Sequence, residues 1–215
     1  MKKVLVQTFV CITFITGSLT LFNASTAKVD SEEGFFASEE ADTSVQDVVD
    51  WIVKSQNNRG KPFMVVDKKK AKLFVFDMDG RILAATPVLL GLTRGDVTTP
   101  GIGKMKPSEI PRKDRTTAAG KFLLQKGMDL EGGKVLWLDY ESGLAIHSIP
   151  EKNKSTRLKQ LKSKNPNEHR ATLGCVNVTK EFYLTILSPL FDHTNGYAYI
   201  LPETMPVERF FGIGG

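Results

Sequence analysis

Residues 63–84 read FMVVDKKKAKLFVFDMDGRILA, and their pattern indicates the fold class. It contains three short apolar or β-branched runs separated by polar residues, which is the pattern of β-strands joined by turns. The runs are residues 63–66, 73–76 and 82–84. Asp79-Gly80, in the second turn, favours the positive φ angles of a tight hairpin. The stretch predicts an antiparallel meander, and the lysines at 68–70 are expected to form a solvated turn.

The rest of the chain contains further short strands and few helices. Strands are expected at residues 120–125, 135–139, 144–147 and 197–201. Helices are expected at about 44–57 and at 179–187. This pattern predicts a mostly β fold, a sandwich or barrel. The polar segment 93–119 is too long for an ordinary connection, so it is either functional or disordered. A second polar segment, 151–170, is strongly basic.

The amino end has the three parts of a secretory signal. Two lysines precede an almost uncharged apolar stretch that ends at Phe22, and small residues lead up to Ala27. Polar residues dilute the stretch below what a stable membrane anchor needs. We interpret residues 1–27 as a cleaved signal. This predicts an exported product in the periplasm or cell wall, without stable membrane insertion.

The remaining sequence is interpreted as an acidic linker with an amphipathic helix (28–60), one main domain (61–205) and a tail (206–215). The chain has 29 Lys or Arg and 24 Asp or Glu residues, and loss of two lysines with the signal leaves a net charge of +3. Such a mild excess is not the footprint of a nucleic-acid-binding protein. No nucleic-acid partner is expected, and the sequence does not specify an oligomeric state.

Cleavage would leave Cys175 as the only cysteine, so no internal disulfide is expected and the thiol is either inert or reactive. A reactive thiol needs a neighbouring imidazole. His147 ends an apolar strand, whereas His169 and His193 stand in less fixed settings. Backbone N–H groups of Gly174 and Cys175 could stabilise an oxyanion. The positive end of the helix expected after residue 178 would lower the pKa of the thiol. These features favour a cysteine acyl-transfer enzyme.

A metal site is the competing interpretation, with Cys175 and the histidines as zinc ligands. None of the four residues has the short paired spacing that is typical of such sites. We therefore expect neither a metal nor another cofactor.

Residues 145–150 (AIHSIP) and 172–178 (TLGCVNV) resemble the paired motifs of the L,D-transpeptidase catalytic domain family, of the YkuD type. The resemblance covers about residues 63–202 and implies that family's β-sandwich or barrel. It implies that Cys175 is the nucleophile and His147 its general base, held through the backbone of Ser148. It also implies that Gly174 and Cys175 supply the oxyanion hole, and that Thr172 and Asn177 shape the site and bind substrate.

The resemblance implies activity on peptidoglycan peptide stems. The cysteine would form an acyl-enzyme at the L-centre of the third residue of a tetrapeptide stem and release D-alanine. An amine of a second stem would then form a 3→3 cross-link, and carbapenems would acylate the same cysteine. Two alternatives stay open. One is a hydrolase with the same site, either an L,D-carboxypeptidase or an amidase; the other is a wall-binding module with an inert thiol.

Three departures from the family pattern are visible. Leu173 stands where the family usually has His, the segment 151–170 looks like an insertion that could form a lid, and the usual Thr-Pro-x-Gly-x-Phe motif reads TAAGKF at 117–122. The basic side chains of this insertion are either simply solvated or bind anionic stem carboxylates or glycan-linked polymers. They are Lys152, Lys154, Arg157, Lys159, Lys162, Lys164 and Arg170.

Overall fold

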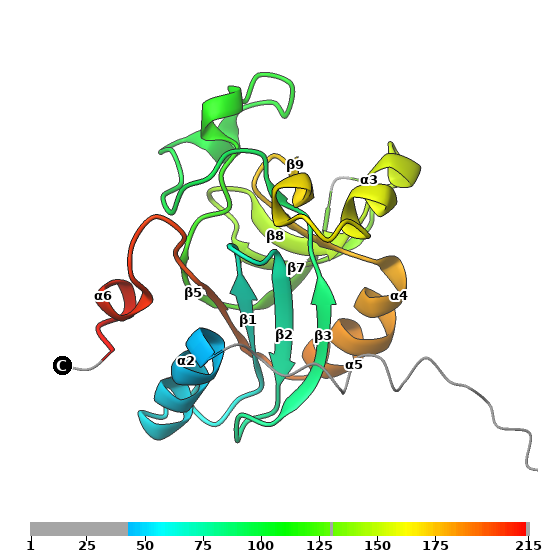
Figure 1. Cartoon of the computed structure of the whole chain (residues 1–215). Coiled ribbons are helices and arrows are strands. Elements are labelled where there is room, and N and C mark those ends of the chain that lie inside the picture. Colours follow the sequence, from blue (N-terminus) through cyan, green and yellow to red (C-terminus); the bar gives the residue numbers. More distant parts are fainter. Residues whose placement is uncertain (1–42, 130, 214–215) are drawn as a thin grey trace, which may run out of the picture. The chain divides into compact units, whose positions relative to one another are not determined.

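The computed structural model describes residues 43–129 and 131–213. The predicted signal (1–27) and residues 28–42 of the predicted linker lie outside the described residues. The mostly β prediction is confirmed, because two main sheets and several short helices build the fold (Figure 1). In the larger sheet the strand order is β3 (Ile82–Pro87), β2 (Lys72–Phe76), β1 (Phe63–Asp67), β11 (Tyr197–Ile200) and β5 (Gly120–Leu123).

The predicted meander forms one half of this sheet. Strand β2 is antiparallel to both β1 and β3, with Phe63 opposite Phe76. Gly80, in the turn between β2 and β3, has a φ of 83°, a conformation that residues with a Cβ rarely adopt. Strand β11 lies parallel to β1 and antiparallel to β5, so the last strand completes the sheet begun by the meander.

The second sheet carries the candidate site. Its strand order is β10 (Val176–Val178), β8 (Leu144–Ser148), β7 (Lys134–Asp139) and β6 (Gln125–Met128). A small parallel pair, β4 (Leu90–Gly91) with β9 (Arg170–Thr172), lies next to it, because the backbone of Leu89 bonds reciprocally with that of Asn177. Residues 120–125 were predicted as one strand, which is wrong. The chain passes from the first sheet to the second at Leu124, whose buried side chain joins the core between them.

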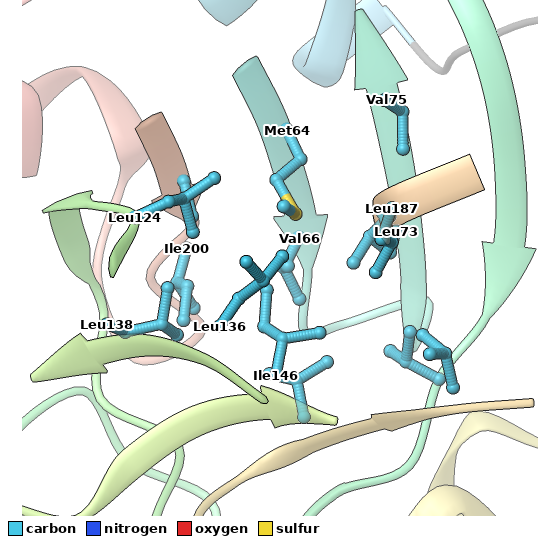
Figure 2. Close-up of a cluster of buried hydrophobic side chains, with 14 of the residues drawn as sticks. Met64, Val66, Leu73, Val75, Leu124, Leu136, Leu138, Ile146, Leu187 and Ile200 are labelled. Atoms are coloured by element: carbon cyan, nitrogen blue, oxygen red, sulfur yellow. The ribbon is translucent and has the colours of Figure 1, made fainter. Parts of the chain in front are cut away.

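Each face of the larger sheet is covered. On one face, Met64 and Val66 of β1 pack with Leu136 of β7 and Ile146 of β8 (Figure 2). The opposite face packs against α2 (Thr43–Lys54), which buries Val45, Val48, Val49 and Ile52, and against α6 (Val207–Phe211). The rings of Trp51 and Phe211 lie 6.0 Å apart. Residues 206–215 were predicted as a tail, but α6 within them belongs to this packed layer, because its aromatic side chain extends the apolar cluster.

The predicted helix after the cysteine is present. It runs through α4 (Lys180–Phe182), the π-helical turn η4 (Tyr183–Leu187) and α5 (Ser188–Phe191). The hydroxyl of Thr179 caps its first turn by accepting from the N–H of Phe182 at 3.2 Å. Within the described ranges, no helix is long and apolar enough to cross a membrane.

The two long polar segments contain short helices. Segment 93–119 includes the 3-10 turns η1 (Ile102–Lys104) and η2 (Arg112–Asp114). Segment 151–170 includes α3 (Lys154–Leu161) and η3 (Pro166–His169). Helix α3 was not predicted, because its sequence is dominated by polar residues and offers only Leu158 and Leu161 to the small apolar cluster beneath it.

A buried ionic cluster ties these segments to the meander. Lys68 is only 1% exposed, and its Nζ donates to Asp96 Oδ1 and to the carbonyl of Thr117, both at 2.8 Å. Arg170 donates to the carboxylate of Glu203 at 2.6 and 3.1 Å. The prediction of a solvated turn at 68–70 is therefore wrong for Lys68, because protein acceptors replace water around its ammonium group. Arg170 likewise does not belong to a solvated basic surface.

Candidate active site

Strands β8 and β10 bring the two halves of the paired motif together. They are parallel, with Asn177 opposite His147 and Val176 opposite Ile146, which places Cys175 beside Ala145. Because side chains alternate along a strand, Cys175 and His147 lie on the same face of the sheet. Ile146 and Val176 point the other way, into the core. The sheet therefore presents its motif residues on one face and anchors them through the other.

The cysteine follows a turn that is held from within. Thr172 Oγ1 donates to the carbonyl of Cys175 at 2.6 Å and accepts from the N–H of Gly174 at 3.2 Å. The hydroxyl of Thr117 donates to the carbonyl of Gly174 at 2.6 Å. Gly174 has a φ of 147°, and a Cβ there would lie 3.1 Å from the carbonyl oxygen of Thr116. Glycine at this position lets the turn pack against that backbone.

The imidazole of His147 has a partner on each nitrogen. Nδ1 lies 2.9 Å from the carbonyl oxygen of Ser148, and Nε2 lies 3.0 Å from the amide nitrogen of Asn177. A carbonyl can only accept, so Nδ1 carries the proton; the amide N–H can only donate, so Nε2 presents its lone pair. This arrangement describes a neutral imidazole with Nε2 as its basic nitrogen.

Arg157 completes this polar group, and the sequence did not single it out. It lies on α3 and donates through Nη1 to Oδ1 of Asn177 at 2.8 Å. In the sequence Arg157 is one of several cations in the basic segment, and only the packing of α3 on the cluster of Leu89 and Ile149 brings it to Asn177. The one sequence signal was its place in a segment that interrupts the paired motif.

The pKa shifts of Cys175 and His147 favour the uncharged form of each group. Burial lowers the pKa of His147, and the charge of Arg157 acts in the same direction, while the Ser148 carbonyl and Asp129 oppose it. Burial raises the pKa of the Cys175 thiol, against the opposing effects of backbone hydrogen bonds and of Arg157. At neutral pH the pair is therefore a thiol and a neutral imidazole. The thiol donates to the carbonyl of Gly143 at 3.3 Å.

The expected lowering of the thiol pKa by a helix dipole is wrong. The helix begins at Lys180, after strand β10, and the extended chain from Cys175 to its cap Thr179 spans about 13 Å at about 3.3 Å per residue. The effect of a helix dipole is confined to its first turn. Burial of the sulfur therefore dominates its ionisation.

A pocket of about 840 Å³ opens above the thiol. Cys175, His147, Ser148 and Gly174 all line it. Segment 93–119 supplies one wall, with Ile102, Met105 and Ile110, whereas segment 151–170 contributes Glu151. The long first segment thus shapes the pocket, and the predicted lid segment lies mainly outside its lining.

Two residues predicted to bind substrate lie beneath the pocket instead of in its wall. Thr172 is 5% exposed and Asn177 is fully buried, and neither lines the pocket. Their side chains contact the cysteine turn, His147 and Arg157. Their position suits a role in orienting the reactive groups. The N–H of Gly174, predicted for the oxyanion hole, is engaged with Thr172 and reaches a ligand only by exchanging that bond.

The other two histidines lie apart from this group. His169 is buried, with Nδ1 3.0 Å from the Val88 carbonyl and Nε2 2.9 Å from that of Ser163. His193 is exposed and lines a second, smaller pocket of about 410 Å³, which adjoins the first through Met128, Lys134 and Tyr183 but does not include Cys175 or His147. Among residues 43–129 and 131–213, no three His, Cys, Asp or Glu side chains gather as metal ligands would.

Comparison with known proteins agrees with the motif geometry. A sequence model described as the L,D-transpeptidase catalytic domain matches residues 61–188, more than half of the chain. No curated protein is similar enough to count as a match.

The solved structures that resemble the chain are distant from it. An LD transpeptidase in complex with imipenem is 17% identical, with a TM-score of 0.37. The match covers 65% of this chain and 58% of that one. An L,D-transpeptidase from Xylanimonas cellulosilytica is 17% identical, with a TM-score of 0.37 and coverages of 66% and 60%. One from Stackebrandtia nassauensis is 15% identical, with a TM-score of 0.40 and coverages of 76% and 68%. The chain thus spans less than two thirds of the first two. Because the domain model matches residues 61–188, the chain belongs to the L,D-transpeptidase catalytic domain family.

Proposed function

We propose that this chain is a cysteine acyltransferase of the cell wall that forms 3→3 peptidoglycan cross-links through a Cys175 acyl-enzyme. The observation that carries the proposal is the placement of Cys175 and His147 on one face of adjacent parallel strands, lining one pocket, with a basic nitrogen on the imidazole. A lone inert thiol would need neither the pocket nor the oriented histidine. The wall-binding alternative is therefore less well supported.

In this mechanism the thiol proton moves to Nε2 of His147 as sulfur attacks the carbonyl carbon of the third stem residue. Asn177 occupies Nε2 in the resting site, so its amide must withdraw as the proton arrives. The tetrahedral oxyanion would be stabilised by the N–H of Cys175, joined by that of Gly174 once it leaves Thr172. Collapse breaks the peptide C–N bond, and the imidazolium returns the proton to the departing D-alanine amine. The resulting thioester then awaits an amine.

The second half-reaction uses the same proton transfers through His147. The amine of a second stem attacks the thioester carbonyl, its proton passes to His147, and the thiol is regenerated as the cross-link forms. Water in place of the amine would give a tripeptide stem and an L,D-carboxypeptidase. The proposal places the enzyme outside the cytoplasm, at the wall, as expected from the signal interpretation of residues 1–27.

Incubation with tetrapeptide muropeptides tests the proposed function. We expect products with the mass of two stems minus one D-alanine, because an amine resolves the acyl-enzyme. These dimers should be absent with Cys175→Ala. Free tripeptide without dimer would replace the transferase by the hydrolase. If wild type and Cys175→Ala both leave the tetrapeptide intact, neither activity is present on this substrate.

A further inference from the structure

A chain of three polar contacts runs from helix α3 to the candidate base. Arg157 donates to Oδ1 of Asn177 at 2.8 Å, the Nδ2 of Asn177 faces Nε2 of His147 at 3.0 Å, and Nδ1 faces the carbonyl of Ser148 at 2.9 Å. Asn177 is fully buried between the cation and the imidazole. The backbone of Asn177 is held as well, through reciprocal bonds with Leu89. Only its amide group can therefore reorient by rotation.

The direction of that amide decides which form of His147 is favoured. A guanidinium only donates, so it requires Oδ1 of Asn177 and turns Nδ2 toward the histidine. An N–H that faces Nε2 favours the unprotonated nitrogen. If the amide were reversed, Oδ1 would face Nε2 and would favour a second proton on the ring. Since Ser148 already occupies Nδ1, the amide of Asn177 controls whether His147 is neutral or charged.

We propose that Arg157 is a positioning residue that keeps His147 neutral, and so able to accept a proton, by holding the Asn177 amide in one orientation. Its role in the acylation step rests on the proposed function, but its control of the imidazole charge does not. The segment that interrupts the paired motif thereby acts on the base from beneath the pocket. Burial and the nearby positive charge lower the pKa of His147 in the same direction.

Other charged groups share the surroundings of the imidazole and must be held constant in a test. Asp129 opposes the effect of Arg157 on the His147 pKa, and Cys175 interacts with Arg157. The remaining charged side chains of the same pocket are Glu131, Lys134, Glu151 and Lys180. Lys159 offers a matched control, because it is exposed on the same helix and carries the same charge.

The test is an NMR titration of the imidazole nitrogens in the full chain, with the three histidines assigned by single His→Ala variants. In wild type we expect His147 to be the Nδ1–H tautomer at neutral pH. In Arg157→Ala the midpoint should rise by about one pH unit, a tenfold gain in proton affinity, because the amide can reverse and the charge is lost. In Arg157→Lys the His147 midpoint should lie at least halfway from the Arg157→Ala value back to that of wild type. In Lys159→Ala it should match wild type.

Asn177→Asp provides a second approach if Arg157→Ala fails to fold. A carboxylate can only accept, so it should raise the His147 midpoint further than Arg157→Ala does. The proposal is overturned if the midpoint of Arg157→Ala stays within about 0.2 units of the Lys159→Ala value, or, where Arg157→Ala does not fold, if the midpoint of Asn177→Asp does. The titration uses no substrate, so it stands whether or not muropeptide dimers form. Conversely, if the wild-type chain forms dimers but the variants leave the His147 midpoint unchanged, only the proposed role of Arg157 is lost.

Discussion

His147→Ala is expected to slow acylation of Cys175 by about 10²- to 10⁴-fold at neutral pH, the usual contribution of a positioned general base. The reason lies in the resting charges. Burial raises the pKa of the thiol, so the sulfur does not ionise by itself near neutrality and needs an acceptor for its proton. In the proposed mechanism Nε2 of His147, on the neighbouring strand, is that acceptor. The rate is measured as carbapenem adduct formed against time, by intact mass.

The raised pKa of the thiol also predicts how the rate difference between wild type and His147→Ala changes at high pH. Because the pKa of the thiol is raised, hydroxide replaces the missing base only at high pH, and the gap between wild type and His147→Ala should narrow there. His193→Ala is the control, since this exposed histidine lies in the other pocket. A His147→Ala rate within threefold of wild type, or an equal loss in His193→Ala, would rule out His147 as the base.

Lys68→Ala is expected to lower the free energy of unfolding by about 3–5 kcal/mol, the usual effect of removing one partner of a buried ion pair. The change leaves Asp96 and Glu203, whose side chains are almost fully buried, without their nearest ammonium group. It also removes the donor to the carbonyl of Thr117, whose hydroxyl holds Gly174. Guanidinium unfolding followed by fluorescence measures the loss.

Lys69→Ala provides the comparison for this prediction. Lys69 is the next residue and is exposed, so its change should stay within about 0.5 kcal/mol of wild type. Equal unfolding midpoints for Lys68→Ala and Lys69→Ala would mean that the buried cluster contributes nothing net.

The dependence of stability on acid pH is a second prediction for the same buried cluster, and unfolding measured between about pH 2 and 5 tests it. Burial would raise the pKa of Asp96, but hydrogen bonds from Lys68, Thr204 and the Glu203 backbone lower it from 3.8 to about 2. The carboxylate therefore contributes stability above about pH 4, and this contribution is lost as the pH falls toward 2.

Local pattern was enough to predict most of the fold. The meander follows from alternating apolar runs and the Asp79-Gly80 turn, and α2 from the helical spacing of its valines, because both depend on neighbours in sequence. The passage of the chain from one sheet to the other at Leu124 could not be predicted from local pattern. Residues 120–125 look like one continuous strand, and only the packing of two sheets around Leu124 divides them.

The charged residues were the least predictable. Lys68 stands in a run of three lysines, and nothing local distinguishes it from Lys69. Its burial depends on acceptors that arrive from residues 95, 96 and 117, far along the chain. Arg157 likewise cannot be distinguished by sequence from the neighbouring cations, although in the structure it donates to Asn177. The paired motifs were enough to expect Cys175 and His147 side by side, as adjacent strands place them, whereas Arg157, which contacts Asn177, lies outside both motifs.

The assignment of Cys175 as the acylated residue is tested by the intact mass of the full chain after incubation with a carbapenem, measured beside Cys175→Ala. The chain has a second cysteine, Cys11, within the predicted signal, so the variant also shows which thiol reacts. We predict a gain of one drug mass in wild type and none in Cys175→Ala. An unmodified wild type, or an adduct that persists in Cys175→Ala, would contradict the assignment of Cys175 as the acyl-accepting nucleophile.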